Sequence, residues 1–213
     1  MAIVIINPNS TTSMTEAMVS VAQSAAPDLT FEGWTSEKGS PSIQGPEDGE
    51  AAAPHLLDLV DRASAQGAEG IIIGCFDDTA LKEASQRVSC PVIGIGQASY
   101  HYAAMRGWRF SVVTTLAVSV PVLEANIRNQ GLGHAVAKVR ASNVPVLELE
   151  ADPMCSARTI KKEALRAEQD DDIAAVILGC AGMVQVVAAV RDALKIETID
   201  PVACAAKCLK WMT

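Results

Sequence analysis

Two cysteines stand in closely matched surroundings in the two halves of this 213-residue chain. Cys75 ends the segment G-I-I-I-G-C, and Cys180 ends the segment A-A-V-I-L-G-C. Each follows a glycine at the end of an apolar run and is expected to open a helix, where free backbone N–H groups favour thiolate over thiol. A single buried cysteine is often just a small core residue. Two in matching context point instead to a pair of reactive thiols.

A pair of thiols on opposite sides of a planar substrate can move a proton between its two faces. One sulfur, as thiolate, removes the proton next to a carbonyl, and the other, as thiol, delivers a proton to the opposite face. Such transfer is most efficient when the catalytic pKa lies near the ambient pH, and a coupled pair shares its protons. The pattern therefore predicts acid–base chemistry at a carbon adjacent to a carbonyl.

Polar residues follow other predicted strands and are candidates for substrate contacts. Asn9 could bind a carbonyl or amide group, although a turn and helix cap also explain its surroundings. Thr114 and Thr115 occupy the corresponding place in the second half, where threonine is also simply common in strands. Asp77, Asp78 and Thr79 are interpreted as caps of the helix after Cys75, because a carboxylate facing the sulfur would oppose thiolate formation.

The elements that must position these residues alternate along the chain. Strands are predicted for 3–6, 70–73, 92–95, 110–113, 174–178 and 146–149, and helices for 12–25, 50–64, 79–87, 120–129, 159–166 and 183–194. This order predicts an α/β fold with mainly parallel sheets flanked by helices. A weak internal repeat predicts two pseudo-symmetric lobes, with the active site between them beyond the strand ends. The first lobe is expected to comprise 1–96 plus 201–213, and the second 97–200.

Composition and missing motifs narrow the function further. The net charge of −8 and the absence of basic runs argue against nucleic-acid and membrane partners. No apolar run could span a bilayer, and the N-terminus lacks signal-peptide features, so a cytoplasmic location is expected. Six cysteines without a CxxC pair predict neither a disulfide framework nor a metal site. Without a nucleotide-binding motif or a lysine placed for pyridoxal, no cofactor is expected.

Several motifs together resemble one family, the hydantoin racemases of the aspartate/glutamate racemase superfamily. The similarity runs over nearly the whole chain. It is carried by I-N-P-N-S-T at 6–11, C-F-D-D at 75–78, F-S-V-V-T-T at 110–115 and L-G-C-A-G-M at 178–183, with weaker support at 42–45, 91–95 and 145–147. One departure is Gln97, where a glutamate is expected.

The resemblance implies two lobes around a central site, assembly as a homo-oligomer, and cofactor-independent racemisation of 5-monosubstituted hydantoins. Cys75 and Cys180 fall on the family's two catalytic cysteines. Substrate contacts are implied at Asn9, Thr115 and the backbone near Phe76 and Gly182.

Alternatives remain open at this point. The substrate could be allantoin or another small neutral cyclic ureide, or an amino acid such as aspartate or glutamate. Because the four motifs hold no arginine or lysine for a substrate carboxylate, they favour a neutral ring. From other classes, a non-catalytic small-molecule-binding protein is disfavoured by retention of both cysteines. A one-cysteine hydrolase lacks a suitably placed histidine.

Overall fold

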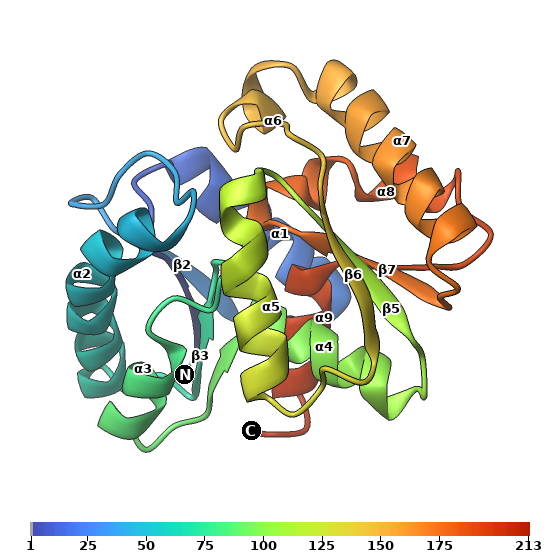
Figure 1. Cartoon of the computed structure of the whole chain (residues 1–213). Coiled ribbons are helices and arrows are strands. Elements are labelled where there is room, and N and C mark those ends of the chain that lie inside the picture. Colours follow the sequence, from blue (N-terminus) through green and yellow to red (C-terminus); the bar gives the residue numbers. More distant parts are fainter. Residues whose placement is uncertain (1) are drawn as a thin grey trace.

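The computed structural model describes residues 2–213, which form two parallel four-stranded sheets flanked by helices (Figure 1). The first sheet has the order β2 (Phe31–Thr35), β1 (Ile3–Asn7), β3 (Gly70–Ile73), β4 (Val92–Gly94). The second has the order β6 (Val136–Ala141), β5 (Phe110–Thr114), β7 (Ala175–Gly179), β8 (Glu197–Ile199). The two orders are equivalent, which confirms the predicted pseudo-symmetric α/β architecture.

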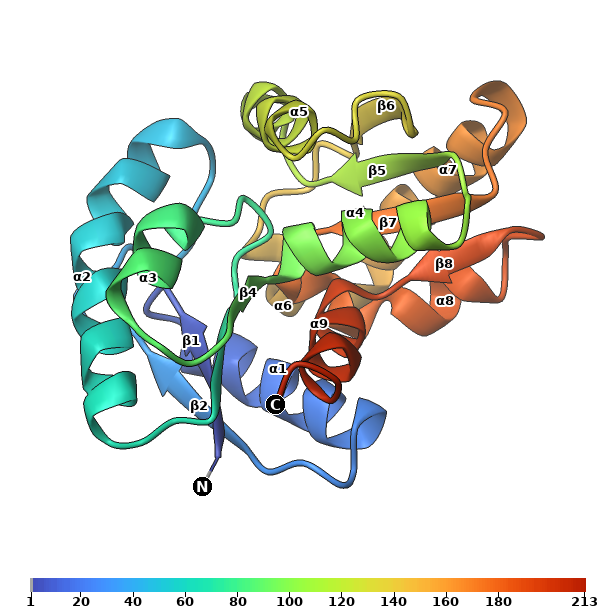
Figure 2. The same cartoon turned by 90° about the horizontal axis from the view of Figure 1, so that it is seen from below.

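Helices fill the space between the sheets and cover their outer faces. The inner helices are α1 (Thr12–Ala25), α4 (Ile95–Met105), α5 (Val120–Asn129) and α9 (Pro201–Leu209). In Figure 2, α4 and α9 lie between the two sheets, and α9 contacts strands of both. The outer helices are α2 (Pro46–Ala65) and α3 (Leu81–Arg87) on the first sheet, and α7 (Pro153–Asp170) and α8 (Val187–Arg191) on the second. A short helix, α6 (Glu148–Ala151), precedes α7.

The central strands β1, β3, β5 and β7 are buried on both faces, which explains their largely apolar sequences. Side chains alternate along each strand. Ile3 and Ile5 pack inward, whereas Val4 and Ile6 pack against the outer helices. The inward-facing residues of both sheets join in one hydrophobic cluster. The lobes therefore share a core, and the lobe boundaries expected from the sequence stay a prediction.

Several elements differ from those expected. The strand predicted at 146–149 is wrong: this segment is a turn leading into α6, and the Val146 N–H bonds the Gln44 side chain. The helix predicted at 183–194 is instead a 3-10 helix, η2 (Ala181–Gln185), followed by the short α8. Strands β2, β6 and β8 and helices α4 and α9 were not predicted. β2 and β6 are edge strands with mixed sequences, so they lack the continuous apolar signal of the central strands.

None of the helices within residues 2–213 combines the length and the apolar composition that are needed to cross a bilayer.

Candidate active site

All six residues predicted for the site line one cavity between the two lobes. They are Asn9, Cys75, Phe76, Thr115, Cys180 and Gly182. Four of the six come directly after the central strands β1, β3, β5 and β7, or two residues beyond them. Because parallel strands present their carboxyl ends at the same edge of a sheet, the two equivalent sheets bring these residues together.

The cavity at this site is too small for a ring-sized ligand. Its volume is about 30 Å³, whereas pockets that hold small molecules are typically about 300–1,000 Å³. Two hydrogen bonds join the lobes: Ser13 Oγ donates to Glu150 Oε2 at 2.8 Å, and the N–H of Val146, which borders the cavity, donates to Gln44 Oε1 at 3.1 Å. A substrate of ring size therefore requires the lobes or the bordering loops to separate before it enters.

Cys75 follows β3 but does not open a helix, contrary to the prediction. A turn comes next, and α3 begins only at Leu81. Burial, followed by the negative charge of Asp77, raises the pKa of the Cys75 thiol well above its ordinary value. The Thr79 hydroxyl and the backbone N–H of Asp77 oppose this rise but do not overcome it.

Cys180 immediately precedes η2, close to the expected arrangement. Burial raises the pKa of its thiol to about 11, although the backbone N–H groups of Gly182 and Met183 stabilise the thiolate and lower it. A Cβ at position 182 would lie 2.9 Å from Leu149 Cδ1, so a larger residue there would require the Leu149 side chain to shift. The sequence predicted lowered thiol pKa values, and this prediction is wrong for the structure. Desolvation raises both pKa values by more than the nearby N–H groups lower them.

The two thiols are electrostatically linked. Ionisation of Cys180 contributes to the raised pKa of Cys75. The loss of one proton therefore makes the loss of the second less favourable, so the pair favours one thiolate beside one thiol.

Asn9 offers a free donor to the cavity. Its side-chain oxygen accepts hydrogen bonds from Asn7 Nδ2 and from the Thr11 N–H, both at 2.9 Å. Among residues 2–213, the one partner of its nitrogen is the Met14 sulfur, at 3.7 Å. The amide is thus oriented with N–H groups available for a ligand acceptor.

Thr114, the last residue of β5, and Thr115, which follows it, have different surroundings. The Thr114 hydroxyl donates to the Gly179 carbonyl at 3.0 Å and so ties β5 to β7. No hydrogen bond to the Thr115 hydroxyl is found within residues 2–213, and this residue lines the cavity. Of the two hydroxyls considered from the sequence, that of Thr115 is therefore the one free to bind a ligand.

Asp77 and Asp78 do not cap α3 as predicted. Asp78 accepts hydrogen bonds from the N–H groups of Gly96 at 3.0 Å and Gln97 at 2.8 Å, and so caps α4 instead. Burial raises the pKa of its carboxyl to about 8. The Gln97 side chain accepts the Gly94 N–H at 3.4 Å and is absent from the cavity lining. Asp77 lines the cavity, and burial raises its pKa to about 6.

Sequence reasoning missed both Asp77 and an apolar part of the lining. Met14, Ile43 and Val146 border the cavity from α1 and from the loops that follow the edge strands β2 and β6. The sequence indicated Ile43 and Val146 only indirectly, because they lie in the segments 42–45 and 145–147 that carry part of the family resemblance. The missed edge strands hid the fact that both loops leave the same edge as the catalytic candidates.

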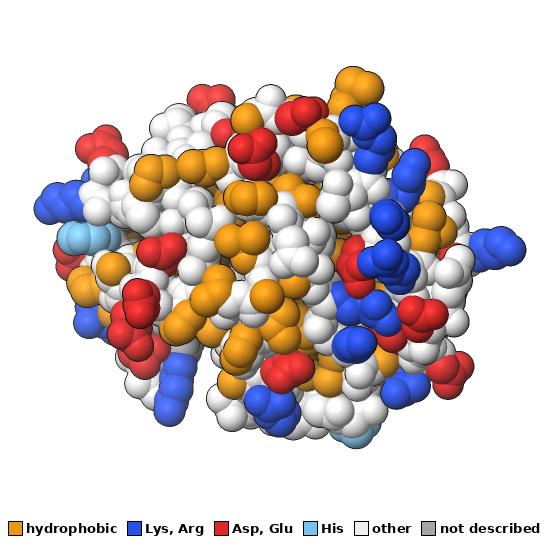
Figure 3. Space-filling model, turned by 45° about the horizontal axis from the view of Figure 1, so that its top comes forward, with side chains coloured by type: hydrophobic (Ala, Val, Ile, Leu, Met, Phe, Trp, Pro, Cys, Tyr) orange, Lys and Arg blue, Asp and Glu red, His pale blue; other side chains and the backbone are white. Residues whose placement is uncertain are grey.

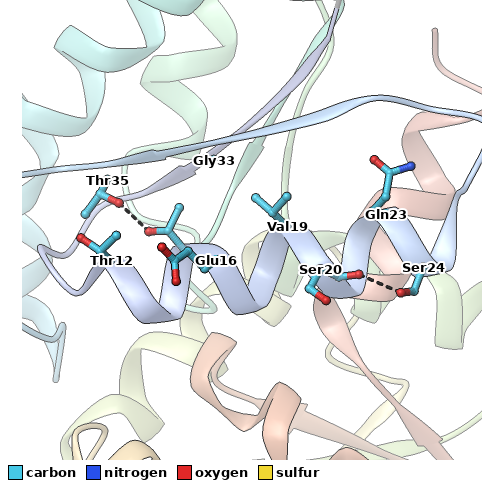
Figure 4. Close-up of a pocket in the computed structure, with 9 residues that line it drawn as sticks. Thr12, Glu16, Val19, Ser20, Gln23, Ser24, Gly33 and Thr35 are labelled. Atoms are coloured by element: carbon cyan, nitrogen blue, oxygen red, sulfur yellow. Dashed lines mark hydrogen bonds between the residues drawn. The ribbon is translucent and has the colours of Figure 1, made fainter.

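A larger hollow lies elsewhere on the molecule. It has a volume of about 650 Å³ between α1 and β2, where Thr15 and Thr35 share a hydrogen bond of 2.7 Å (Figure 4). Its nine lining residues include no cysteine and none of the residues predicted for the site. Both candidate acid–base residues, Cys75 and Cys180, line the smaller cavity. We therefore take the smaller cavity as the candidate active site.

The other cysteines lie outside the cavity. Cys204 and Cys208 are buried on α9, as expected for packing residues. Cys155 is exposed near the start of α7. Within residues 2–213, no group of three or more His, Cys, Asp or Glu side chains is arranged to hold a metal ion.

The fold and cavity define a class of two-lobed α/β proteins that carry a cysteine from each lobe at the interface. The model of the Asp/Glu/Hydantoin racemase family matches residues 3–209. This chain therefore belongs to that family. It is 38% identical to a hydantoin racemase of Rhizobium meliloti, over 97% of this chain and 86% of that protein.

Solved structures agree with this assignment. An allantoin racemase from Klebsiella pneumoniae superposes with a TM-score of 0.92 at 32% identity, covering 99% of this chain and 86% of that one. An allantoin racemase from Pseudomonas fluorescens superposes with a TM-score of 0.94 at 31% identity, covering 99% and 90%.

Proposed function

We propose that this protein is a cofactor-independent racemase of 5-monosubstituted hydantoins, with Cys75 and Cys180 as its two acid–base groups. The observation that carries the proposal is that both thiols line one cavity, each following the equivalent central strand of its own sheet. The similarity to the Rhizobium meliloti hydantoin racemase supports the same activity.

The reaction needs only a thiolate and a thiol. The thiolate takes the proton from the ring carbon that bears the substituent, and the electron pair moves onto the adjacent carbonyl oxygen. The second thiol then delivers its proton to the opposite face of that carbon. The first cysteine ends as thiol and the second as thiolate, so the reverse reaction uses the same groups with exchanged roles.

The negative oxygen formed in this step needs hydrogen-bond donors. Asn9 Nδ2 lacks an oxygen acceptor in the structure, and the Thr115 hydroxyl borders the same cavity. Preoriented donors at a developing oxyanion are typically worth factors of about 10²–10³ in rate. We assign this role to Asn9, with Thr115 and the backbone near Phe76 and Gly182 as further substrate contacts.

The charges of the cavity favour a neutral substrate over an amino acid. Of the described residues that line it, Asp77 alone is charged, and no arginine or lysine is among them. A substrate carboxylate would meet a like charge and no cation. A cyclic ureide instead brings carbonyl and N–H groups, and aspartate or glutamate is the less suitable ligand.

Allantoin is the second candidate substrate, because the two solved structures described above are allantoin racemases. Allantoin carries a polar ureido substituent. Met14, Ile43 and Val146 give this cavity an apolar side that suits an alkyl substituent better. We therefore place 5-alkyl hydantoins ahead of allantoin.

The test follows the optical activity of single enantiomers of 5-methylhydantoin, 5-isopropylhydantoin, allantoin and aspartate, with spontaneous racemisation subtracted. We expect loss of optical activity with both hydantoin enantiomers, slower loss with allantoin and none with aspartate. Dialysis against a chelator is expected to leave the rate unchanged. Racemisation of aspartate alone, or dependence on added zinc, would overturn the proposal.

We further propose that the enzyme is cytoplasmic and assembles as a homo-oligomer. The six cysteines are all free, as in a reducing compartment. Figure 3 shows hydrophobic side chains gathered in the middle of one face. Large apolar residues are exposed at Val118, Leu147 and Met154, with 48%, 44% and 77% of their surface accessible. Sedimentation velocity tests the assembly, and a purely monomeric protein at micromolar concentration would contradict it.

A further inference from the structure

The carboxylate of Asp77 has no partner in the structure and borders the cavity that holds both thiols. Within residues 2–213, it takes part in neither a hydrogen bond nor an ion pair, and burial is the single cause of its raised pKa. Burial of an unpaired carboxylate is unfavourable. The neighbouring Asp78, by contrast, has two backbone N–H partners.

The turn that carries Asp77 is held firmly from several sides. Its carbonyl oxygen accepts a hydrogen bond from Asn126 Nδ2 in the other lobe at 2.7 Å. On one side Asp78 is tied to α4, and on the other the Phe76 ring packs edge-on against Tyr100 with 5.4 Å between centroids. The backbone position of Asp77 is thus fixed by the fold.

The placement of this charge works against the thiols unless something compensates it. The negative charge of Asp77 raises the pKa of both cysteines, after burial as the main cause. A hydrogen-bond donor on the substrate would satisfy the carboxylate and weaken its field at the sulfurs. A cyclic ureide carries such donors in its ring N–H groups, whereas the carbonyl oxygens have Asn9 as their donor.

We propose that the Asp77 carboxylate accepts a hydrogen bond from a ring N–H of the substrate and thereby selects cyclic ureides with that N–H free. This inference rests on the proposed function, because it concerns recognition at the same cavity. It makes Asp77 a substrate-binding residue and explains why an otherwise unfavourable charge lies beside two thiols. Binding of the N–H also makes thiolate formation easier when substrate is present.

The experiment pairs enzyme variants with methylated substrates. Wild type, Asp77→Asn and Asp77→Ala are assayed with 5-methylhydantoin and with its N1-methyl and N3-methyl derivatives. Charge-assisted hydrogen bonds are about twice as strong as neutral ones. We therefore expect kcat/KM of the wild type to fall at least about tenfold on methylation of one ring nitrogen. In Asp77→Asn, the activity on 5-methylhydantoin falls by a similar factor, and the penalty for that methyl group shrinks to about twofold.

Controls separate recognition from structural damage. Asp58→Asn changes an exposed aspartate of α2 and is expected to retain the wild-type penalty. Thermal unfolding establishes that each Asp77 variant is folded, and the alanine variant supplies the comparison if the asparagine variant is not.

The outcomes also distinguish this inference from the proposed function. If wild type racemises 5-methylhydantoin but the methyl penalty is equally large in both Asp77 variants, Asp77 does not accept the N–H and only this inference fails. If wild type racemises neither hydantoins nor allantoin, the proposed function itself fails.

Discussion

Asn7 and Asn9 form a pair in which the first residue orients the second. Asn7 Nδ2 donates to Asn9 Oδ1 at 2.9 Å and also to Thr15 Oγ1 at 3.0 Å, which anchors it to α1. Asn7 is fully buried, whereas Asn9 lines the cavity. Because the acceptor atom of Asn9 is occupied, its N–H groups are directed to a ligand before that ligand arrives.

Replacement of Asn9 tests this orientation. Asn9→Ala removes the donor proposed for the carbonyl oxygen, so we expect kcat to fall about 10²–10³-fold with a smaller change in KM. Steady-state racemisation of 5-methylhydantoin measures both constants. Asn129→Ala, at the exposed end of α5, is the matched control and should retain full activity. An unchanged kcat in folded Asn9→Ala would contradict the role.

Substitutions of the adjacent threonines 114 and 115, at the end of β5, should separate effects on activity from effects on stability. Thr114→Val leaves the buried Gly179 carbonyl without its hydroxyl partner, and is expected to cost about 1–3 kcal/mol of unfolding free energy. Thr115→Val removes a hydroxyl that has no hydrogen-bond partner among the described residues, so it should lower kcat/KM while the unfolding midpoint stays near that of wild type. Urea unfolding and kinetics on both variants measure the contrast. The reverse pattern would show that the two hydroxyls are assigned the wrong way round.

Each cysteine should serve one face of the substrate. Cys75→Ser and Cys180→Ser are each expected to reduce racemisation by about 10²–10⁴-fold or more, since both proton transfers are needed. The remaining thiolate can still remove the proton on its own side and return a solvent proton to that face. NMR in deuterated buffer should therefore show exchange with one enantiomer in each variant, and with opposite enantiomers in the two. Exchange of the same enantiomer by both variants would refute the two-thiol mechanism.

The raised thiol pKa values predict a steep pH dependence of alkylation. The thiolate is the nucleophile, and the pKa of Cys180 is about 11, so inactivation by iodoacetamide should speed up about tenfold per pH unit from pH 7 to 9. Asp77→Asn removes a negative charge that raises both pKa values, so its inactivation should be faster at each of these pH values.

The exposed thiol of Cys155 would react first and complicate this measurement. Cys155→Ala is therefore the background for the alkylation series, and it should have wild-type activity. Peptide mass spectrometry then assigns the modified sulfurs. A rate that is already independent of pH above 7 would mean that the cavity thiols ionise readily after all.

Much of the fold could be predicted because its central strands are buried on both faces. β1, β3, β5 and β7 are mostly apolar runs, and they can be recognised in the sequence without knowledge of their neighbours. The edge strands β2 and β6 contain exposed polar residues and depend on pairing with β1 and β5 for their conformation. Local sequence therefore did not reveal them.

For the candidate site too, some features could be predicted from the sequence and others could not. The sequence alone identified the two Gly-Cys strand ends, the candidates Asn9 and Thr115, and the repetition of one type of lobe. These features are local or recur along the chain. Only the tertiary structure decided that Asp78 caps α4 while Asp77 lines the cavity. It also decided that burial raises the thiol pKa values. Desolvation and the direction of a side chain depend on all the elements packed around a residue, and adjacent positions such as 77 and 78 can therefore have opposite roles.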